Sequence, residues 1–145
     1  MLESLHPYLL PIHVTTVFGL VGLVLLADVV GFRWIRGIEA TLDPKKLSRL
    51  HTSVWCGLAV MVVSGFFMFW PYREYLLFEM TFRIKMLFVL TLIVNGFFIG
   101  RLMHVAITLP FADLPADDKK KLFISGGIST LSWAGAITCG LLINL

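Results

Sequence analysis

The chain has 145 residues, of which 58% are hydrophobic and only 14% charged, with a mean hydropathy of +0.88 and a net charge of +3. An average soluble domain has roughly 25% charged residues, and here the charges are concentrated in segments 33–49, 73–85 and 113–121. A chain this short cannot bury the long uncharged stretches between those segments on every side. The composition therefore excludes a soluble domain, a disordered chain and a nucleic-acid-binding module. It predicts an integral membrane protein in contact with the lipid bilayer.

Four apolar stretches are each long enough to cross a bilayer, which takes about 20 residues in a helix. Backbone in lipid must form helices or closed barrels, and these stretches lack the alternating pattern of a barrel strand. We therefore predict an all-α, four-helix membrane bundle that forms one domain over residues 1–145. The expected helices cover about residues 8–32, 50–70, 82–107 and 122–143.

The basic residues between the expected helices are distributed unevenly, which predicts an orientation. The first and third loops hold eight of them: Arg33, Arg36, Lys45, Lys46, Arg49, Lys119, Lys120 and Lys121. The second connection and the start of the next helix hold three: Arg73, Arg83 and Lys85. Cytoplasmic loops carry the excess of Lys and Arg, so we expect both termini in the periplasm, for a protein of the bacterial inner membrane.

Small residues recur at helical spacing in the last two expected helices. Gly96 and Gly100 are four apart, and Ser132, Ala136 and Gly140 form a second stripe. Such spacing lets two helices approach closely. We expect packing within the chain, with a homodimer face as the alternative.

Two histidines are expected at the same depth near the cytoplasmic face, His51 on the second helix and His104 on the third. Polar side chains inside a span need a partner or a function, and two histidines at one depth can hold a haem iron between helices. Arg101, in the same layer, could bind a haem propionate or pair with Asp28. Depth matching thus predicts a b-type haem held by His51 and His104.

A second layer near the periplasmic face contains His13 on the first helix and Lys85 on the third. Asn95, in the middle of the third helix, could donate a hydrogen bond to a haem or a substrate, or form an interhelical hydrogen bond. Imidazole and thioether groups also suit Cu(I), so a copper site is the alternative. Its candidate ligands are His6, His13, Met68, Met80 and Met86. A further interpretation is that the histidines lie at the membrane interface and bind nothing.

Three short motifs carry a resemblance to known proteins. The first helix begins Pro-Ile-His13-Val-Thr-Thr-Val-Phe-Gly-Leu-Val-Gly, the second ends with Ser64-Gly65 before Phe-Phe-Met-Phe-Trp, and the third opens Phe82-Arg-Ile-Lys85-Met-Leu. The order of motifs resembles the copper-resistance protein D family and the membrane-bound, haem-containing protoporphyrinogen oxidase family. The resemblance implies that His13 is an axial haem ligand or a copper ligand and that Lys85 holds a propionate. For this chain, the resemblance implies b-haem binding in a four-helix bundle, but it does not imply the oxidase reaction.

The function expected from the sequence is that of a b-type haem protein, either an electron-transfer element or a membrane subunit of a larger redox complex. A copper-handling membrane protein and a non-catalytic membrane scaffold are the alternatives. If the protein is an enzyme, we expect a membrane oxidoreductase, with other redox subunits or a second copy of the chain as partners.

Overall fold

The computed structural model describes residues 6–143, which form helices joined by short connections. The four long helices are α1 (His6–Ile35), α2 (Pro44–Phe69), α4 (Met80–Thr108) and α5 (Ala116–Leu142). The short ones are the 3-10 turn η2 (Trp70–Tyr72) and helix α3 (Arg73–Leu76), both between α2 and α4, and the 3-10 turn η3 (Phe111–Asp113) before α5. All four long helices are long and apolar enough to cross a membrane, so the predicted all-α, four-helix membrane architecture is confirmed.

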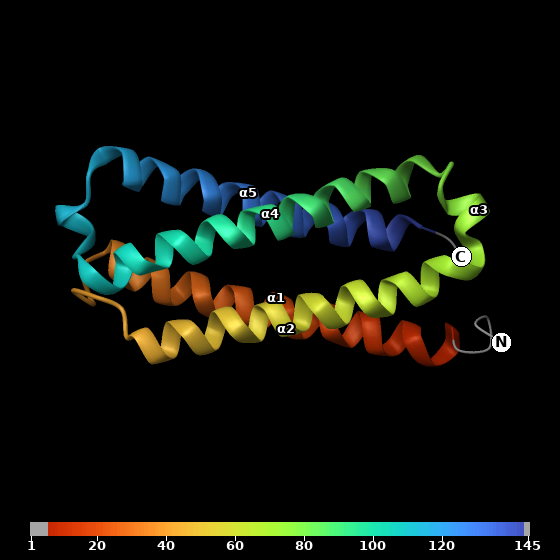
Figure 1. The fold of residues 1–145 in the computed structure, drawn as a ribbon, viewed down its shortest axis with the longest axis horizontal. Helices are drawn as coiled ribbons and strands as arrows, with labels where there is room; N and C mark the ends of the chain where they lie inside the picture. Colours follow the sequence, from red (N-terminus) through yellow and green to blue (C-terminus); the bar gives the residue numbers. More distant parts are fainter. Residues whose placement is uncertain (1–5, 144–145) are drawn as a thin grey trace.

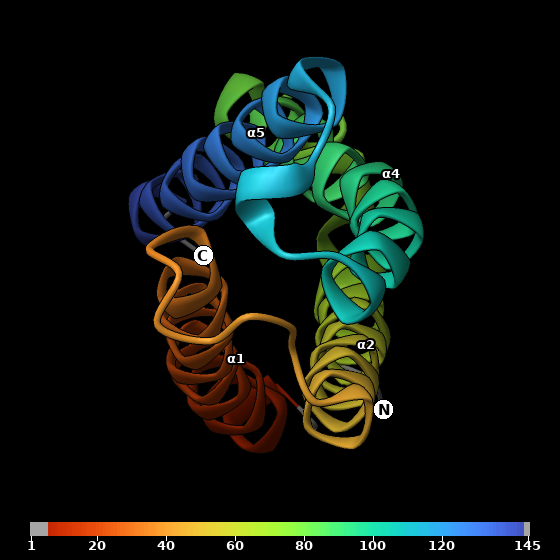
Figure 2. The same ribbon diagram turned by 90° about the vertical axis from the view of Figure 1, so that its left-hand side faces the viewer.

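The four helices run up and down along one axis (Figure 1). α1 begins and α5 ends at one end of the bundle, which we call the terminal end; the α1–α2 and α4–α5 connections lie at the other, the loop end. α1 packs mainly on α2, and α4 packs mainly on α5. These two helical hairpins, α1–α2 and α4–α5, share fewer contacts with each other. Seen from the loop end, the α1–α2 hairpin lies on one side of the bundle and the α4–α5 hairpin on the other (Figure 2).

Two helices begin about six residues earlier than the apolar stretches predicted. α2 begins at Pro44, where the Asp43 carboxylate accepts a 2.9 Å hydrogen bond from the Lys45 amide; proline needs no N–H partner in a first turn. α5 begins with Asp117 and Asp118 in its first turn, where acidic side chains favour the positive end of the helix dipole. A count of apolar residues misses these polar first turns, because they lie beyond the stretch that lipid requires.

α1 also extends further than predicted, from residue 6 to residue 35 instead of 8 to 32. Pro7 lies in its first turn, where its missing N–H costs nothing. The helix ends where Gly37 adopts a φ of +71° and donates a 3.0 Å hydrogen bond to the Trp34 carbonyl. A residue with a Cβ would be strained in that conformation.

The buried side chains are few and concentrate between the hairpins. At the loop end, Trp34 is 2% exposed and its indole N–H donates a 3.1 Å hydrogen bond to the Leu109 carbonyl, which ties the end of α1 to the end of α4. Leu20, Leu92 and Trp133 form a second buried cluster farther along the bundle. Most other large apolar side chains are exposed on the outside, as contact with a bilayer requires.

Candidate functional site

His13 on α1 is held by a serine from the neighbouring helix. Its Nδ1 lies 2.9 Å from Ser64 Oγ on α2, and the same Oγ lies 2.8 Å from the Val60 carbonyl oxygen. The serine has one hydrogen, which it donates to that carbonyl, so it accepts the hydrogen bond from His13 Nδ1–H. The other ring nitrogen, Nε2, then carries a lone pair, and within residues 6–143 it forms no hydrogen bond.

Lys85 on α4 lies near this imidazole, within range of a charge interaction with it. Its Nζ is 3.4 Å from the position that a Cβ would take at Gly140 on α5, and a Cβ at Gly65 on α2 would meet the His13 ring at the same distance. Within residues 6–143 the ammonium group forms no hydrogen bond and no ion pair. His13, Ser64, Gly65, Lys85 and Gly140 together are called the terminal-end site.

Among the described residues, no hydrogen bond or ring contact joins His13 to another predicted copper ligand. His6 packs edge-on against Tyr72, with ring centroids 5.8 Å apart, and its buried Nε2 has no hydrogen-bond partner within the described range. Met80 and Met86 are exposed, at 65% and 44%. Among the described residues, no group of three or more His, Cys, Asp and Glu side chains has an arrangement that could hold a metal ion.

His51 on α2 has its Nε2 engaged by a tryptophan one turn away. The Trp55 indole N–H donates a 3.1 Å hydrogen bond to His51 Nε2, which leaves the imidazole hydrogen on Nδ1. Both rings cover glycines of α4: a Cβ at Gly100 would lie 3.2 Å from His51 Nε2, and one at Gly96 would lie 3.1 Å from Trp55. The predicted Gly96 and Gly100 stripe therefore accommodates two side chains of α2.

Arg101 lies at the edge of this arrangement, whereas His104 is not among the residues that line it. Both are exposed; Arg101 lines a small surface hollow beside His51, and His104 lines neither that hollow nor the larger cavity described below. His51 and His104 therefore share neither of these two hollows. Of the two roles expected for Arg101, the ion pair with Asp28 is not formed, because none of the ion pairs within residues 6–143 includes either residue. Matching depth does not fix which side of a helix a residue occupies.

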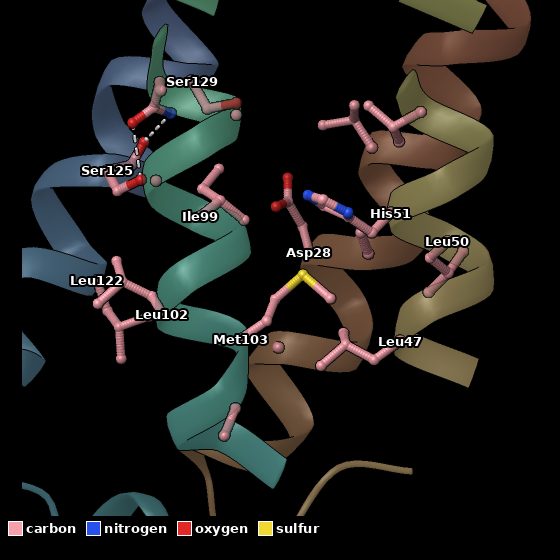
Figure 3. Close-up of a pocket in the computed structure, with 18 of the residues that line it drawn as sticks. Asp28, Leu47, Leu50, His51, Ile99, Leu102, Met103, Leu122, Ser125 and Ser129 are labelled. Carbon is pink, nitrogen blue, oxygen red and sulfur yellow. Dashed lines mark hydrogen bonds between the residues drawn. The ribbon is translucent and has the colours of Figure 1, made fainter. Parts of the chain in front are cut away.

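A cavity of about 460 Å³ lies between the hairpins in the half of the bundle nearer the loop end, and side chains from all four long helices line it (Figure 3). The lining is mostly apolar. Asp28 from α1 and His51 from α2 project into it toward each other, and neither a hydrogen bond nor an ion pair joins them. They are the titratable side chains of the lining.

Asn95 also lines the cavity, but its amide is already paired. Asn95 Nδ2 donates a 2.9 Å hydrogen bond to the Ser125 carbonyl, and Ser125 Oγ donates a 2.8 Å hydrogen bond to Asn95 Oδ1. Both residues are buried, at 6% exposure. Of the two roles expected for Asn95, the structure contains the interhelical hydrogen bond.

Two contacts of these sites were not anticipated from the sequence. Ser64 is 51 residues from His13, and a serine in an apolar helix gives no signal of what lies beside it. Trp55 is one helical turn from His51, so that spacing could have pointed to their hydrogen bond. The chain matches no protein-family model, no curated protein and no solved structure.

Proposed function

We propose that this protein is an integral membrane b-type haem protein with His13 as an axial ligand. In this proposal it acts as an electron-transfer element or as the membrane subunit of a redox complex. The observation that carries the proposal is the terminal-end site. There an imidazole fixed through Nδ1 offers a free Nε2 beside an ammonium group that has no partner among the described residues.

The Ser64 hydrogen bond favours His13 as a ligand over the other histidines. A histidine that binds a metal almost always donates its other ring N–H to a nearby acceptor, which fixes the tautomer and the ring orientation. His13 has that arrangement with Ser64. His51 has the opposite one, because its Nε2 already accepts from Trp55.

Lys85 supports the same site through its charge. An ammonium group inside a membrane span is costly unless it meets an opposite charge, and the carboxylates of a haem are suitable partners. Counted at 1.5 Å per residue, His13 and Lys85 lie roughly 10 Å and 8 Å from the starts of their helices, so both side chains can reach one ligand. When bound, haem would supply one-electron redox chemistry, and the chain's part is to hold it and keep water away.

We also propose that the loop end faces the cytoplasm of a bacterium and that the protein lies in its inner membrane. The eight basic residues of the first and third connections support this orientation. The terminal-end site would then lie near the periplasmic face, within reach of a periplasmic redox partner.

The proposal is tested by titrating haem into the detergent-purified protein. We expect saturable binding with a Soret band, and a loss of affinity of about 100-fold or more in His13→Ala, because an axial ligand is removed. His104→Ala is the matched control, since it deletes an exposed histidine of another helix. Haem binding that is unchanged in His13→Ala, or no binding by the wild type, would refute the proposal.

A further inference from the structure

The cavity at the loop end opens sideways, between α1 and α5. Five of its lining residues are exposed: Asp28 and Phe32 on α1, and Phe123, Gly126 and Gly127 on α5. The other lining residues are buried or half-buried, and the two glycines have nothing within 4 Å of where a Cβ would be. The mouth therefore lies where α1 and α5 face the bilayer, and a lipid-soluble molecule can enter without crossing water.

The polar groups inside this opening determine which hydrogen-bond donors and acceptors such a molecule needs. Asn95 and Ser125 satisfy each other. Ser129 also lines the cavity, but Asp28 and His51 are the titratable groups of the lining and project toward each other, so we take them as the pair that binds a ligand. The Asp28 carboxylate accepts hydrogen bonds. Because His51 Nε2 is used by Trp55, His51 has an Nδ1–H to donate. A ligand lying between them needs one donor and one acceptor.

The walls favour a flat ring. Trp34, Trp55 and Trp133 line the cavity, and its volume of about 460 Å³ is within the range of small-molecule sites, roughly 300–1,000 Å³. Asp28 is seven residues before the end of α1, roughly 10 Å from the loop end of that helix. A ring bound at that depth can leave an apolar tail in the bilayer through the mouth.

We propose that this cavity binds the ring of a lipid-soluble quinol, with one hydroxyl donating to Asp28 and the other oxygen accepting from His51. A lipophilic cation would match the carboxylate but would gain nothing from the imidazole N–H, so the donor–acceptor pair favours the quinol. None of the residues of the terminal-end site lines the cavity. The proposal therefore stands on the cavity alone and does not depend on haem binding at His13.

The test uses 2-heptyl-4-hydroxyquinoline N-oxide, a stable quinol analogue, and follows the quenching of tryptophan fluorescence in the purified full-length protein. Three of the four tryptophans line the cavity, so we expect saturable quenching. Asp28→Leu should weaken binding about tenfold or more, because it removes a hydrogen-bond acceptor. Gly127→Leu should do the same by filling the mouth, whereas Gly22→Leu, at an exposed glycine of α1 outside the cavity, should have no effect.

The site is also distinguished from the proposed haem site. His13→Ala should keep the binding of the analogue unchanged, so the result stands whether or not haem binds. Absence of saturable quenching, or quenching that survives both Asp28→Leu and Gly127→Leu, would overturn the proposal. The proposal would also be overturned if tetraphenylphosphonium displaced the analogue at a lower concentration than a short-chain quinol does. That result would assign the cavity to a lipophilic cation.

Discussion

His13 Nδ1 and Ser64 Oγ lie 2.9 Å apart, although the two residues are separated by 51 positions and belong to different helices. This hydrogen bond joins α1 to α2 inside the span and sets the tautomer of the histidine. Since Ser64 also donates to the Val60 carbonyl, the imidazole is anchored to the backbone of α2 through one hydroxyl.

Removing that hydroxyl should weaken haem binding without abolishing it. In Ser64→Ala the ring loses its acceptor, and we expect haem affinity to fall about 10- to 100-fold, the usual effect of losing the partner of a ligating histidine. Ser53→Ala, at an exposed serine of the same helix, is the control. Haem titration measures both, and equal affinities for the two variants would mean that the hydrogen bond does not orient a ligand.

The α1–α2 contact should be sensitive to volume at Gly57. Leu20 is 1% exposed and packs directly on this glycine, where an added Cβ would overlap its side chain. Gly57→Ala should therefore lower the free energy of unfolding by about 1–3 kcal/mol, the usual cost of overpacking. Gly22→Ala, where nothing lies within 4 Å, should be neutral or stabilising because alanine favours a helix. Denaturant unfolding in detergent compares the two, and a Gly57→Ala protein as stable as the wild type contradicts this packing.

The buried Asn95–Ser125 pair should stabilise the α4–α5 hairpin. Asn95→Ala is expected to cost about 1–2 kcal/mol of unfolding free energy, within the range of interhelical hydrogen bonds in membranes. Adding Ser125→Ala should cost less than the sum of the two single changes, since both remove one interaction. Thr91→Ala, at an exposed position of the same helix, serves as the control. Strict additivity would show that the two residues do not act as a pair.

Orientation can be measured by labelling single cysteines in intact cells, with Cys56 and Cys139 replaced by serine. Lys45→Cys and Lys120→Cys, in or next to the basic loop-end connections, should resist a membrane-impermeant reagent. Glu74→Cys in α3 should react, because it lies at the terminal end, which we expect in the periplasm. The reverse pattern of labelling would invert the topology.

The sequence was sufficient for the four spans, because they follow from apolar length. It was not sufficient to predict toward which neighbour each side chain points, because that depends on how the side chains of adjacent helices pack. Asp28 and Arg101 were expected at one depth, with an ion pair as one of two roles for Arg101, yet Asp28 lines the cavity while Arg101 lines the surface hollow beside it. Likewise, Gly96 and Gly100 were expected to admit another helix backbone, and instead they make room for Trp55 and His51. Periodicity alone does not show which neighbour fills such a gap.

The central claim, that His13 binds the iron of a haem, is tested most directly by chemical rescue. His13→Gly removes the imidazole and leaves space for a free one, so the reduced-minus-oxidised spectrum of the purified protein should lose its haem bands and regain them when imidazole is added. A residue that only supports the fold would not be replaced by a small molecule. We predict recovery of the Soret and α bands with imidazole and none with an equal concentration of pyrrole, which has no free nitrogen lone pair. Full haem bands in His13→Gly before imidazole is added would contradict the account.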